Sequence, residues 1–430
     1  MALTGRAAVA AVIGVLVVLA LRTVTALVAV DGLILAGIAA DVILAAPVRP
    51  LRMARSGEAR LRLGQTGEVA LTLANPGPRP LHGTVRDAWQ PSAAARPTRA
   101  QVRVPPGGQV RMTTTLAPRR RGDLAADRVT VRSLGPLRLA GRQGSHEAPW
   151  SVRVLPPFSS RRHLPEKLAR LRQLDGQNRS LLRGQGSEFD SLREYVIGDD
   201  VRSIDWRSTA RRAEVLVRTW RPERDRHILI VLDTGRTAAG RVAGVPRLDI
   251  SMDAALLLAA LASRAGDRVS LIAADRQVRA RVTGGGRGQV LPALTDAMAG
   301  LDAELTESDA GLMAATILAV ARQRSLVVLL TDLNPAAVAE GLLPRIPVLA
   351  TRHRLLVAAV ADPRIDEMAA GRGDAAAVYQ AAAGERARSE RARVSAMLRR
   401  RGVEVVDAPP DRLPSALADA YLTLKAAGRL

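Results

Sequence analysis

The pattern of hydrophobic and polar positions divides the 430-residue chain into four parts. Two long apolar stretches come first, and short alternating runs separated by turn formers follow them. A segment rich in charges then precedes a region where apolar, strand-length runs alternate with helix-length segments. The pattern predicts a transmembrane helical hairpin (1–48), a β-sandwich-like domain (49–158), a linker with a charged signature segment (159–226) and an α/β domain (227–430).

The two apolar stretches cover residues 7–21 and 24–46. A membrane-spanning helix needs about 20 residues, so the first stretch is long enough only with its flanks, and the second is long enough alone. A signal peptide is the alternative, but a second apolar stretch follows at once and no clear small-residue cleavage site separates the two. We therefore predict a membrane hairpin that turns near Arg22 and Thr23.

Arginines flank the predicted hairpin on both sides. Arg6 precedes it, and Arg49, Arg52 and Arg55 follow it closely. Positively charged flanks stay on the cytoplasmic side of a membrane. The expected location is therefore the inner (cytoplasmic) membrane, with more than one span and with the soluble domains in the cytoplasm.

The middle of the chain has the pattern of a small antiparallel β-sandwich. Alternating runs occur at residues 69–73, 101–104, 110–113 and 129–132, and turn formers such as Asn75-Pro76-Gly77-Pro78 separate them. Short strands at such spacing are typical of two-sheet folds. Because this part has no recognisable catalytic set, we expect a spacer or a recognition module.

The last 200 residues have the pattern of an α/β domain. Strands and helices that alternate along the chain predict a mostly parallel sheet covered by helices on both faces. We expect strands at residues 227–233, 268–274, 278–282, 325–331, 355–360 and 403–406. The helices are expected at residues 248–264, 289–301, 309–322, 335–343, 374–400 and 414–427.

The composition shows a strong positive charge and excludes chemistry that depends on cysteine. The formal net charge is +22, which would suit an anionic partner such as nucleic acid or anionic lipid. Almost all basic residues are arginines, the lysines being Lys167 and Lys425, and they are spread along the chain, which favours a compositional bias over a binding patch. The absence of cysteine excludes disulfides, a thiol nucleophile and a zinc–thiolate site.

The charged segment and the strand after it carry a family resemblance. Residues 186–237 hold four of the nine aromatic residues, alternate charges of both signs, and end in Asp233-Thr234-Gly235-Arg236-Thr237. This run resembles the signature of the domain-of-unknown-function 58 family, whose members carry a von Willebrand factor A-like domain. The resemblance implies the same Rossmann-like, mostly parallel sheet for residues 227–430.

The resemblance also implies a candidate metal site. In von Willebrand A domains, Asp-x-Ser-x-Ser and residues of two later loops bind a divalent cation. Asp233 and Thr237 match the first loop, whereas Gly235 replaces the middle serine; Asp332 matches the second acidic position. For the remaining hydroxyl ligand we choose Ser308, with Thr306 as the alternative. The ion would be Mg²⁺ or Mn²⁺, which prefer carboxylate and hydroxyl oxygens.

A second interpretation of this site needs no metal. Asp233 and Asp332 at the ends of neighbouring strands would repel each other unless a cation or a proton lay between them. Arg236, beside the site, is an alternative source of positive charge. The sequence leaves open a metal site and a network of aspartates and arginines.

The charged segment contains a second group of candidate functional residues. A general acid/base pair of Asp199 and Asp200 is one interpretation, but Gly198-Asp199-Asp200 has the composition of a turn. A mixed-charge network that docks the segment on the α/β domain or on a partner is favoured, since structural ion networks resemble active sites in a sequence. The predicted partner-binding residues are Glu188, Arg193, Asp199, Asp200, Arg202, Asp205 and Arg211.

These features predict a membrane-anchored, non-enzymatic interaction or adaptor protein. Its partner would bind the metal-site-like face of the α/β domain, and the resemblance implies a MoxR-type AAA+ ATPase in protein assembly or maturation. The alternatives are a metal-dependent hydrolase that uses Asp233 and Asp332, and arginine-mediated binding of anionic lipid or nucleic acid. The enzyme hypothesis lacks a nucleophile with its base, because the five histidines have no partner spacing.

Overall fold

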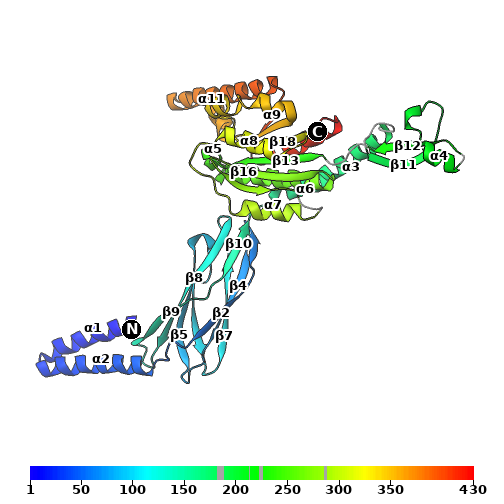
Figure 1. The fold of residues 1–430 in the computed structure, drawn as a ribbon. Helices are drawn as coiled ribbons and strands as arrows, with labels where there is room; N and C mark the ends of the chain where they lie inside the picture. Colours follow the sequence, from blue (N-terminus) through cyan, green and yellow to red (C-terminus); the bar gives the residue numbers. More distant parts are fainter. Residues whose placement is uncertain (182–187, 213, 222–225, 285–287) are drawn as a thin grey trace. The chain divides into compact units, whose positions relative to one another are not determined.

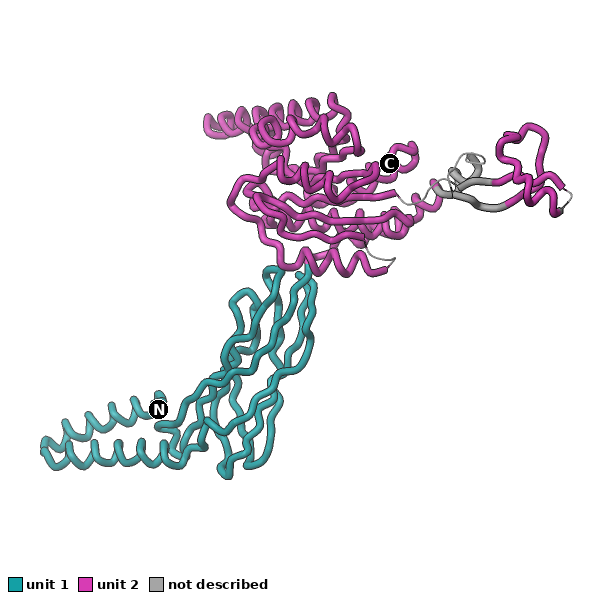
Figure 2. The backbone as a smooth tube through the Cα atoms, in the orientation of Figure 1, with its two compact units in different colours: residues 1–155 teal, residues 156–430 magenta. Residues whose placement is uncertain are grey.

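The computed structural model describes residues 1–181, 188–212, 214–221, 226–284 and 288–430. The chain divides into two compact units, residues 1–155 and 156–430, which Figure 2 shows in two colours. Each unit has its own apolar core, so each is described by itself.

The first unit begins with two apolar helices that lie side by side, α1 (Gly5–Leu21) and α2 (Val24–Leu44) (Figure 1). Arg22, in the left-handed region, ends α1, and the Thr23 hydroxyl accepts a hydrogen bond from Ala26 N at the start of α2. Of the described helices, α2 is the one long and apolar enough to cross a membrane; α1 has 17 residues.

The last turn of α2 is joined to the β-structure through Asp41. This carboxylate is fully buried and accepts hydrogen bonds from the backbone N–H groups of Leu137 (2.8 Å), Leu139 (2.6 Å) and Ala140 (3.0 Å). Three donors replace the water that a buried carboxylate loses. Asp41, one of the two aspartates in the second apolar stretch, therefore has a structural role: it fixes the end of α2 to the backbone at the start of β9 (Ala140–His146).

Two sheets form the rest of the first unit. Their inner faces share a core that includes Leu71, Leu73, Val85 and Val131, as the alternating pattern predicts. One sheet has the order β1-β9-β8-β10-β3 with β5 and β6 attached, and the other has the order β2-β4-β7. The strands are β1 (Ala2–Leu3), β2 (Arg52–Gly57), β3 (Arg60–Arg62), β4 (Gly67–Ala74), β5 (Leu81–Trp89), β6 (Arg99–Val104), β7 (Gln109–Leu116), β8 (Gly122–Leu134), β9 (Ala140–His146) and β10 (Ser151–Leu155).

The second unit is built on a six-stranded sheet in the order β17-β16-β13-β18-β19-β20. Five strands are parallel and β17 is antiparallel to β16, which confirms the predicted mixed α/β class. The strands are β13 (His227–Asp233), β16 (Arg268–Ala274), β17 (Val278–Val282), β18 (Ser325–Leu330), β19 (Arg354–Val360) and β20 (Glu404–Ala408).

Helices cover both faces of this sheet. Successive side chains of a strand point to opposite faces, so Ile228 and Ile230 enter one core and Leu229 and Val231 enter another. This is why the predicted strands are continuous apolar runs. The first core is covered by α6 (Arg247–Arg264), α7 (Val290–Ala299) and α12 (Leu413–Ala426), and the second by α8 (Ala310–Val320), α9 (Ile346–Arg352) and α11 (Ala375–Arg400).

Part of the predicted linker belongs to this unit. Residues 164–181 form helix α3 (Leu164–Leu181), whose Leu171 is buried in the first core. Lys167 Nζ lies 2.9 Å from both carboxylate oxygens of Asp419 on α12. The apolar face of α3 and this ion pair make it a helix of the α/β unit and not a connecting segment.

The charged segment forms a small structure of its own. Strands β11 (Glu188–Glu194) and β12 (Leu216–Arg221) pair antiparallel. Between them lie a 3₁₀ turn, Val201–Ser203, and the short helix α4 (Trp206–Arg212). Gly198, at φ 110°, and the hydrogen bond from Asp199 N to Val196 O (3.0 Å) confirm the predicted turn.

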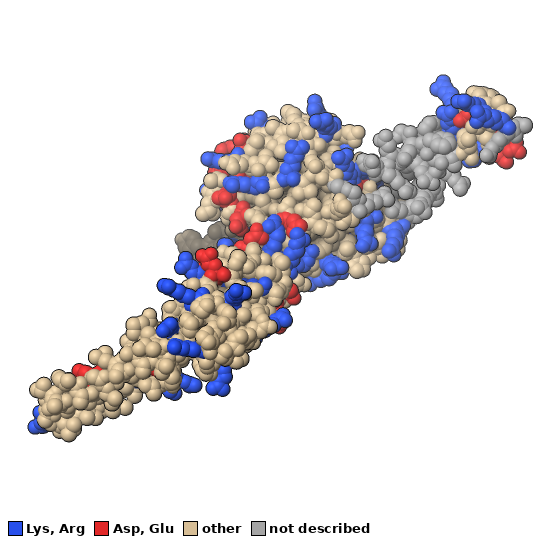
Figure 3. All heavy atoms as spheres, turned by 60° about the horizontal axis from the view of Figure 1, so that its bottom comes forward, with Lys and Arg blue, Asp and Glu red and all other residues tan. Residues whose placement is uncertain are grey.

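Basic side chains are spread over the visible face of the molecule. In Figure 3 the Lys and Arg atoms are scattered over both units, with Asp and Glu between them, while the end formed by the two apolar helices is largely uncharged. This distribution agrees with the expected compositional bias toward arginine and differs from a compact basic patch.

Candidate functional site

Aspartates follow the parallel strands at the carboxyl-terminal edge of the six-stranded sheet. Asp233 ends β13, Asp275 follows β16, Asp332 follows β18 and Asp407 lies near the end of β20. Parallel strands end at the same edge, and this edge is where open α/β sheets bind ligands. We call these residues and the loops that contact them the strand-end edge.

Asp233 is held by neutral donors. It is 6% exposed and accepts hydrogen bonds from Gly235 N (2.9 Å), from the Thr331 hydroxyl (2.6 Å) and from the Ser308 hydroxyl. Within the described residues no arginine, lysine or histidine pairs with this carboxylate. Asp233 is therefore a buried negative charge stabilised by dipoles and not by a cation.

Ser308 explains why residue 235 is glycine. A Cβ built on Gly235 would lie 2.1 Å from Ser308 Oγ and 2.9 Å from Thr306 O. The Ser308 hydroxyl thus fills the space that a side chain at position 235 would need. Of the two candidates in this loop, Ser308 contacts Asp233 through its hydroxyl, whereas Thr306 uses its backbone carbonyl to accept from Arg236 N (2.7 Å).

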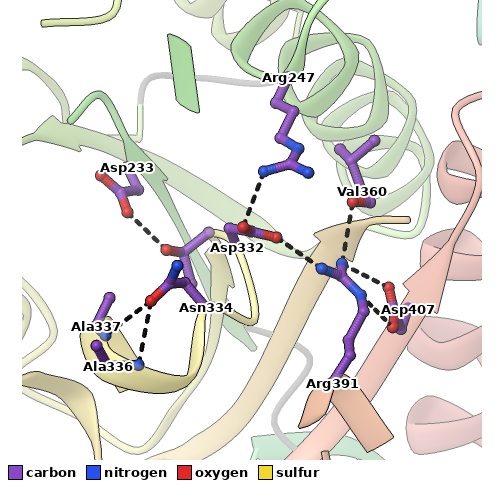
Figure 4. Close-up of polar contacts among 10 residues, drawn as sticks. Asp233, Arg247, Asp332, Asn334, Ala336, Ala337, Val360, Arg391 and Asp407 are labelled. Atoms are coloured by element: carbon purple, nitrogen blue, oxygen red, sulfur yellow. Dashed lines mark hydrogen bonds and ion pairs between the residues drawn. The ribbon is translucent and has the colours of Figure 1, made fainter. Parts of the chain in front are cut away.

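Asp332 is clamped between two arginines (Figure 4). Arg247 Nη1 lies 2.8 Å from Asp332 Oδ2, and Arg391 Nη1 lies 2.8 Å from Asp332 Oδ1. Arg391 also donates to both oxygens of Asp407 (2.7 and 2.8 Å) and to Val360 O (3.0 Å). The clamp joins the ends of β18, β19 and β20 to α6 and α11.

A small hollow connects the two aspartates. It is lined by Asp233, Thr237, Ser251, Thr331 and Asp332, together with Arg247 and apolar neighbours. The structure thus brings the predicted residues Asp233, Thr237, Ser308 and Asp332 to one edge. Thr331, which sequence analysis missed, donates a hydrogen bond to Asp233 directly. The sequence feature that could have identified it is its position between the end of β18 and Asp332.

The residues fit a divalent cation only in part. Asp233, Thr237, Ser308 and Thr331 carry the carboxylate and hydroxyl oxygens that Mg²⁺ prefers. Asp332 does not fit, because both of its oxygens already accept from guanidinium groups whose positive charge would repel a second cation. The described residues contain no cluster of three or more His, Cys, Asp or Glu side chains suited to a metal.

The arginines of this network differ from the predicted one. Arg236 pairs with Glu307 (2.9 Å) on the surface, and not with either aspartate of the site. Arg247 and Arg391 take its place, although they lie 85 and 59 residues from Asp332 in the chain. Because no local pattern marks such distant pairs, sequence analysis could not identify them.

Asp275 is a further carboxylate that sequence analysis missed. It is buried and accepts from the Thr234 hydroxyl (2.9 Å), Gln277 N (3.0 Å) and Arg279 Nε (2.8 Å). Burial raises the pKa of this carboxyl, but the hydrogen bond from Arg279 and those from Thr234 and Gln277 outweigh it, so its pKa lies below the usual value. Asp275 anchors the loop that carries Asp233.

The charged segment holds an internal ion network. Arg193 binds Asp199 through two hydrogen bonds (2.6 and 2.7 Å) and lowers the pKa of that carboxyl. Asp205 accepts from Ser208 N (3.0 Å), which lowers its pKa, and from Arg218 Nε (2.8 Å).

The two neighbouring aspartates of this segment have separate partners. Asp200 accepts from Arg202 N (3.0 Å), whereas Asp199 pairs with Arg193, so a shared acid/base role is not supported. Arg211 is exposed, and the Glu188 side chain lies outside the described residues. Arg218, which sequence analysis missed, completes the network.

A family model described as "Protein of unknown function DUF58" matches residues 191–406, half of the chain. The chain belongs to the DUF58 family. The matched range starts in β11 and ends in β20, so it contains most of the charged segment and, of the strand-end aspartates, Asp233, Asp275 and Asp332.

Several relatives and solved structures are similar to parts of this DUF58 protein. The uncharacterized proteins Rv1480 of Mycobacterium tuberculosis and Mb1516 of Mycobacterium bovis are each 28% identical over 207 residues, 45% of this chain and 61% of theirs. The chain therefore spans about three fifths of the length of these relatives.

Two solved structures resemble parts of the chain more weakly. They are the CARDB domain of the PF1109 protein from Pyrococcus furiosus (14% identity, 24% of this chain and 86% of that domain, TM-score 0.18) and proximal thread matrix protein 1 from the mussel byssus (13% identity, 47% of each chain, TM-score 0.29). Both TM-scores are below 0.5, so they do not define the fold.

Proposed function

We propose that this DUF58 protein is a membrane-anchored, non-enzymatic interaction protein whose α/β domain binds a partner protein at the strand-end edge. The observation that carries the proposal is the contrast between its two central carboxylates. Asp332 is neutralised and fixed by two arginines, while Asp233 is buried without a cation among the described residues.

A buried carboxylate without a cation favours a positive charge supplied from outside. That charge would be an arginine or lysine of the partner, or a cation that the partner helps to coordinate. Mg²⁺ or Mn²⁺ remains our proposed ion, with Asp233, Thr237, Ser308 and Thr331 as its ligands and Asp332 as a ligand only after Arg247 has moved. The von Willebrand A-like assignment is part of this proposal, and the sheet with its Asp233–Thr237 loop supports it.

The strand-end edge favours recognition over catalysis. The two arginines hold both oxygens of Asp332 in an ion network, so this carboxylate has no free oxygen for a substrate. A hydrolase that used both aspartates would need Asp332 as well as Asp233 to bind a water or a proton during the reaction. The arginines are spread along the chain and, on the face that Figure 3 shows, lie among carboxylates, which gives little support to lipid or nucleic-acid binding as the main role.

The membrane attachment rests on α2. Its length and composition suit a span, and residues such as Leu33 and Leu35 are exposed along it. We propose that α1 and α2 form a two-span hairpin in the inner membrane and that arginines keep both ends on the cytoplasmic side. The partner, by family resemblance, is a MoxR-type AAA+ ATPase that this protein would adapt to its clients.

The test is a pull-down of the detergent-solubilised chain with a MoxR-type ATPase of the same cell, with and without ATP and Mg²⁺. Asp233→Asn removes the charge and keeps the shape, so it should reduce capture at least tenfold. The matched control is Asp362→Asn, which changes an aspartate that caps a helix after β19. Equal capture of the parent and Asp233→Asn would exclude Asp233 from the interface; no capture of the parent would exclude the ATPase.

A further inference from the structure

An exposed leucine stands on a fixed loop of the strand-end edge. Leu305 is 79% exposed, although its neighbours are tied to the first strand-end loop. Glu304 N donates to Thr234 O (2.7 Å), Arg236 N donates to Thr306 O (2.7 Å), and Ser308 donates to Asp233. A large apolar side chain that is rigidly presented to solvent is typical of a docking anchor.

The loop that carries Leu305 is acidic. Residues 302–309 hold Asp302, Glu304, Glu307 and Asp309. Two exposed arginines face them: Arg236 lies 2.9 Å from Glu307, and Arg279 lies 3.6 Å from Glu304. Surface pairs of this kind contribute little and exchange easily, so Glu304 and Glu307 can take basic partners from another molecule. The complementary surface would be apolar at its centre and basic around it.

The charged segment carries such a surface. We call residues 195–212 the hairpin tip. Its turn and its short helices expose Ile197 (96%), Trp206 (65%), Val196 and Val201. Trp and Arg are the residues most enriched at the energetic centres of protein interfaces.

The charges that remain on the hairpin tip are mainly positive. Asp199 and Asp205 are neutralised from the flanking strands by Arg193 and Arg218. Arg202, Arg207 and Arg211 are exposed, and the described residues give their guanidinium groups no carboxylate partner. Arg207 and Arg211 are four residues apart and so lie on one face of α4.

The hairpin tip has little core of its own. In the described part of the β11–β12 structure, Leu216 and Val217 are the buried apolar side chains. A two-stranded hairpin is marginally stable in water unless something packs on it. Covering Ile197 and Trp206 would therefore stabilise the segment as well as the contact.

We propose that the hairpin tip of one copy docks on the Leu305 loop of a second copy of this chain. Ile197 and Trp206 would pack on Leu305, and Arg207 and Arg211 would pair with Glu304 and Glu307. Leu305 and Trp206 are each largely exposed, so both side chains are available for such a contact. The contact uses different surfaces on the two copies, which produces rings or open chains rather than a closed dimer.

The experiment measures self-association of the full-length chain in detergent by sedimentation velocity across a dilution series. The parent should form dimers and larger species, and raised salt should weaken them. Arg207→Glu with Arg211→Glu should weaken association at least about tenfold, and Glu304→Arg with Glu307→Arg should do the same. Trp206→Ala tests the apolar centre and should have a similar effect.

Mixing the two charge-reversed proteins is the decisive step. Each alone places like charges at the contact, whereas the mixture restores opposite charges at both kinds of contact, so association should return to within about threefold of the parent. Arg386→Glu, on the exposed face of α11, is the control and should associate like the parent. Thermal melting of each variant confirms its fold.

A monomeric parent at all concentrations, or a mixture that stays monomeric, would overturn the proposal. Association that persists unchanged in both reversed proteins would overturn it as well, since another surface would then be responsible. The measurement uses purified chain without any ATPase. Its failure is therefore distinct from a failure of the proposed partner binding, which the pull-down reports separately.

Discussion

At the residue scale, the position of one hydroxyl decides the shape of the strand-end edge. Ser308, from a distant loop, contacts Asp233 in the place where a longer residue at 235 would stand. Glycine at position 235 leaves room for this hydroxyl, so the two residues share one small space beside Asp233.

Gly235→Ala should destabilise the protein by about 1–3 kcal/mol, because the new methyl group would collide with Ser308 Oγ. Urea denaturation measures the difference. Gly300→Ala is the control, since a Cβ there meets nothing within 4 Å, and it should change stability by less than about 0.5 kcal/mol. If Gly235→Ser combined with Ser308→Gly is no more stable than Gly235→Ser alone, the two positions do not share the space.

Cation binding belongs to the same residues. Mg²⁺ or Mn²⁺ at millimolar concentration should raise the melting temperature, and a saturation of 100 times Kd corresponds to about 2.7 kcal/mol. EDTA should reverse the rise, and Asp233→Asn should abolish it while Asp362→Asn retains it. A melting curve that does not respond to either metal would exclude a metal site in the isolated protein. The partner's arginine or lysine would then be the remaining source of positive charge for Asp233.

His353 predicts how stability depends on pH. Its ring is buried and neither ring nitrogen has a hydrogen-bond partner among the described residues; burial, and then the charge of Arg352, lower its pKa. Burial also lowers the pKa of His227. The unfolded chain therefore binds more protons below the ordinary histidine pKa of about 6.5, and the free energy of unfolding should fall as the pH drops below that value.

His353→Leu should flatten this dependence below pH 6.5, as urea denaturation at several pH values can measure. His82→Gln, which changes a half-buried histidine of the first unit, is the control and should leave the slope unchanged. An equal slope in the parent and in His353→Leu would show that other groups cause the pH dependence.

The sequence predicted the residues of the strand-end edge better than their contacts. Asp233, Thr237 and Asp332 could be found because each lies at or just after an apolar strand and matches a position of the metal-binding loops that the family resemblance implies. Arg247 and Arg391 could not be found, since their roles depend on how α6 and α11 cross the sheet ends. A position in a strand is a local property, whereas an ion pair across 59 or 85 residues is a property of the tertiary fold.

At the scale of elements, Arg391 fixes α11 to three strands. Its side chain is largely buried and contacts Asp332, Asp407 and Val360 O. Removing one partner of such a network leaves two carboxylates under-compensated. The helix that carries it is otherwise polar and exposed over much of its length.

Arg391→Ala should lower the free energy of unfolding by about 3–5 kcal/mol. Hydrogen exchange should also become faster in α11, while β13 stays protected. The matched control is Arg386→Ala on the same helix, whose exposed pair with Glu390 should contribute no more than about 0.5 kcal/mol. Equal effects of the two substitutions would contradict the role of the clamp.

The strands of the sheet were the most predictable elements. β13, β16 and β17 have the predicted bounds, because fully buried strands are continuous apolar runs between turn formers. Helices α9 and α10 (Pro363–Ala370) were not predicted. Their segments are short and contain prolines near their first turns, so a search for helical periodicity treats them as loops.

At the scale of the whole molecule, the two units differ in what they expose. The first unit carries α2, along which large apolar side chains are exposed, whereas the exposed apolar side chains of the second unit, such as Trp206 and Leu305, lie outside its two buried cores. Attachment to a membrane should therefore depend on the first unit alone. The second unit alone, residues 156–430, should be soluble without detergent.

The full-length chain should remain in the membrane pellet after alkaline carbonate extraction. Leu33→Lys with Leu35→Lys should release it, because each charge costs about 2.5–3.5 kcal/mol at the centre of a span. Both leucines are exposed in the structure, so the change should leave the fold of the soluble parts intact. A fragment of residues 156–430 is the soluble control, and release of the intact parent by carbonate would exclude a spanning helix.

The burial of Asp41 has a consequence for the order of events during synthesis. Its three backbone donors lie 96, 98 and 99 residues further along the chain. At about 5–20 residues per second, the ribosome needs roughly 5–20 s to make them after it has made α2. Throughout that interval Asp41 has none of its three backbone donors, so α2 can make its contact with this strand end only after the chain has been synthesised to residue 140.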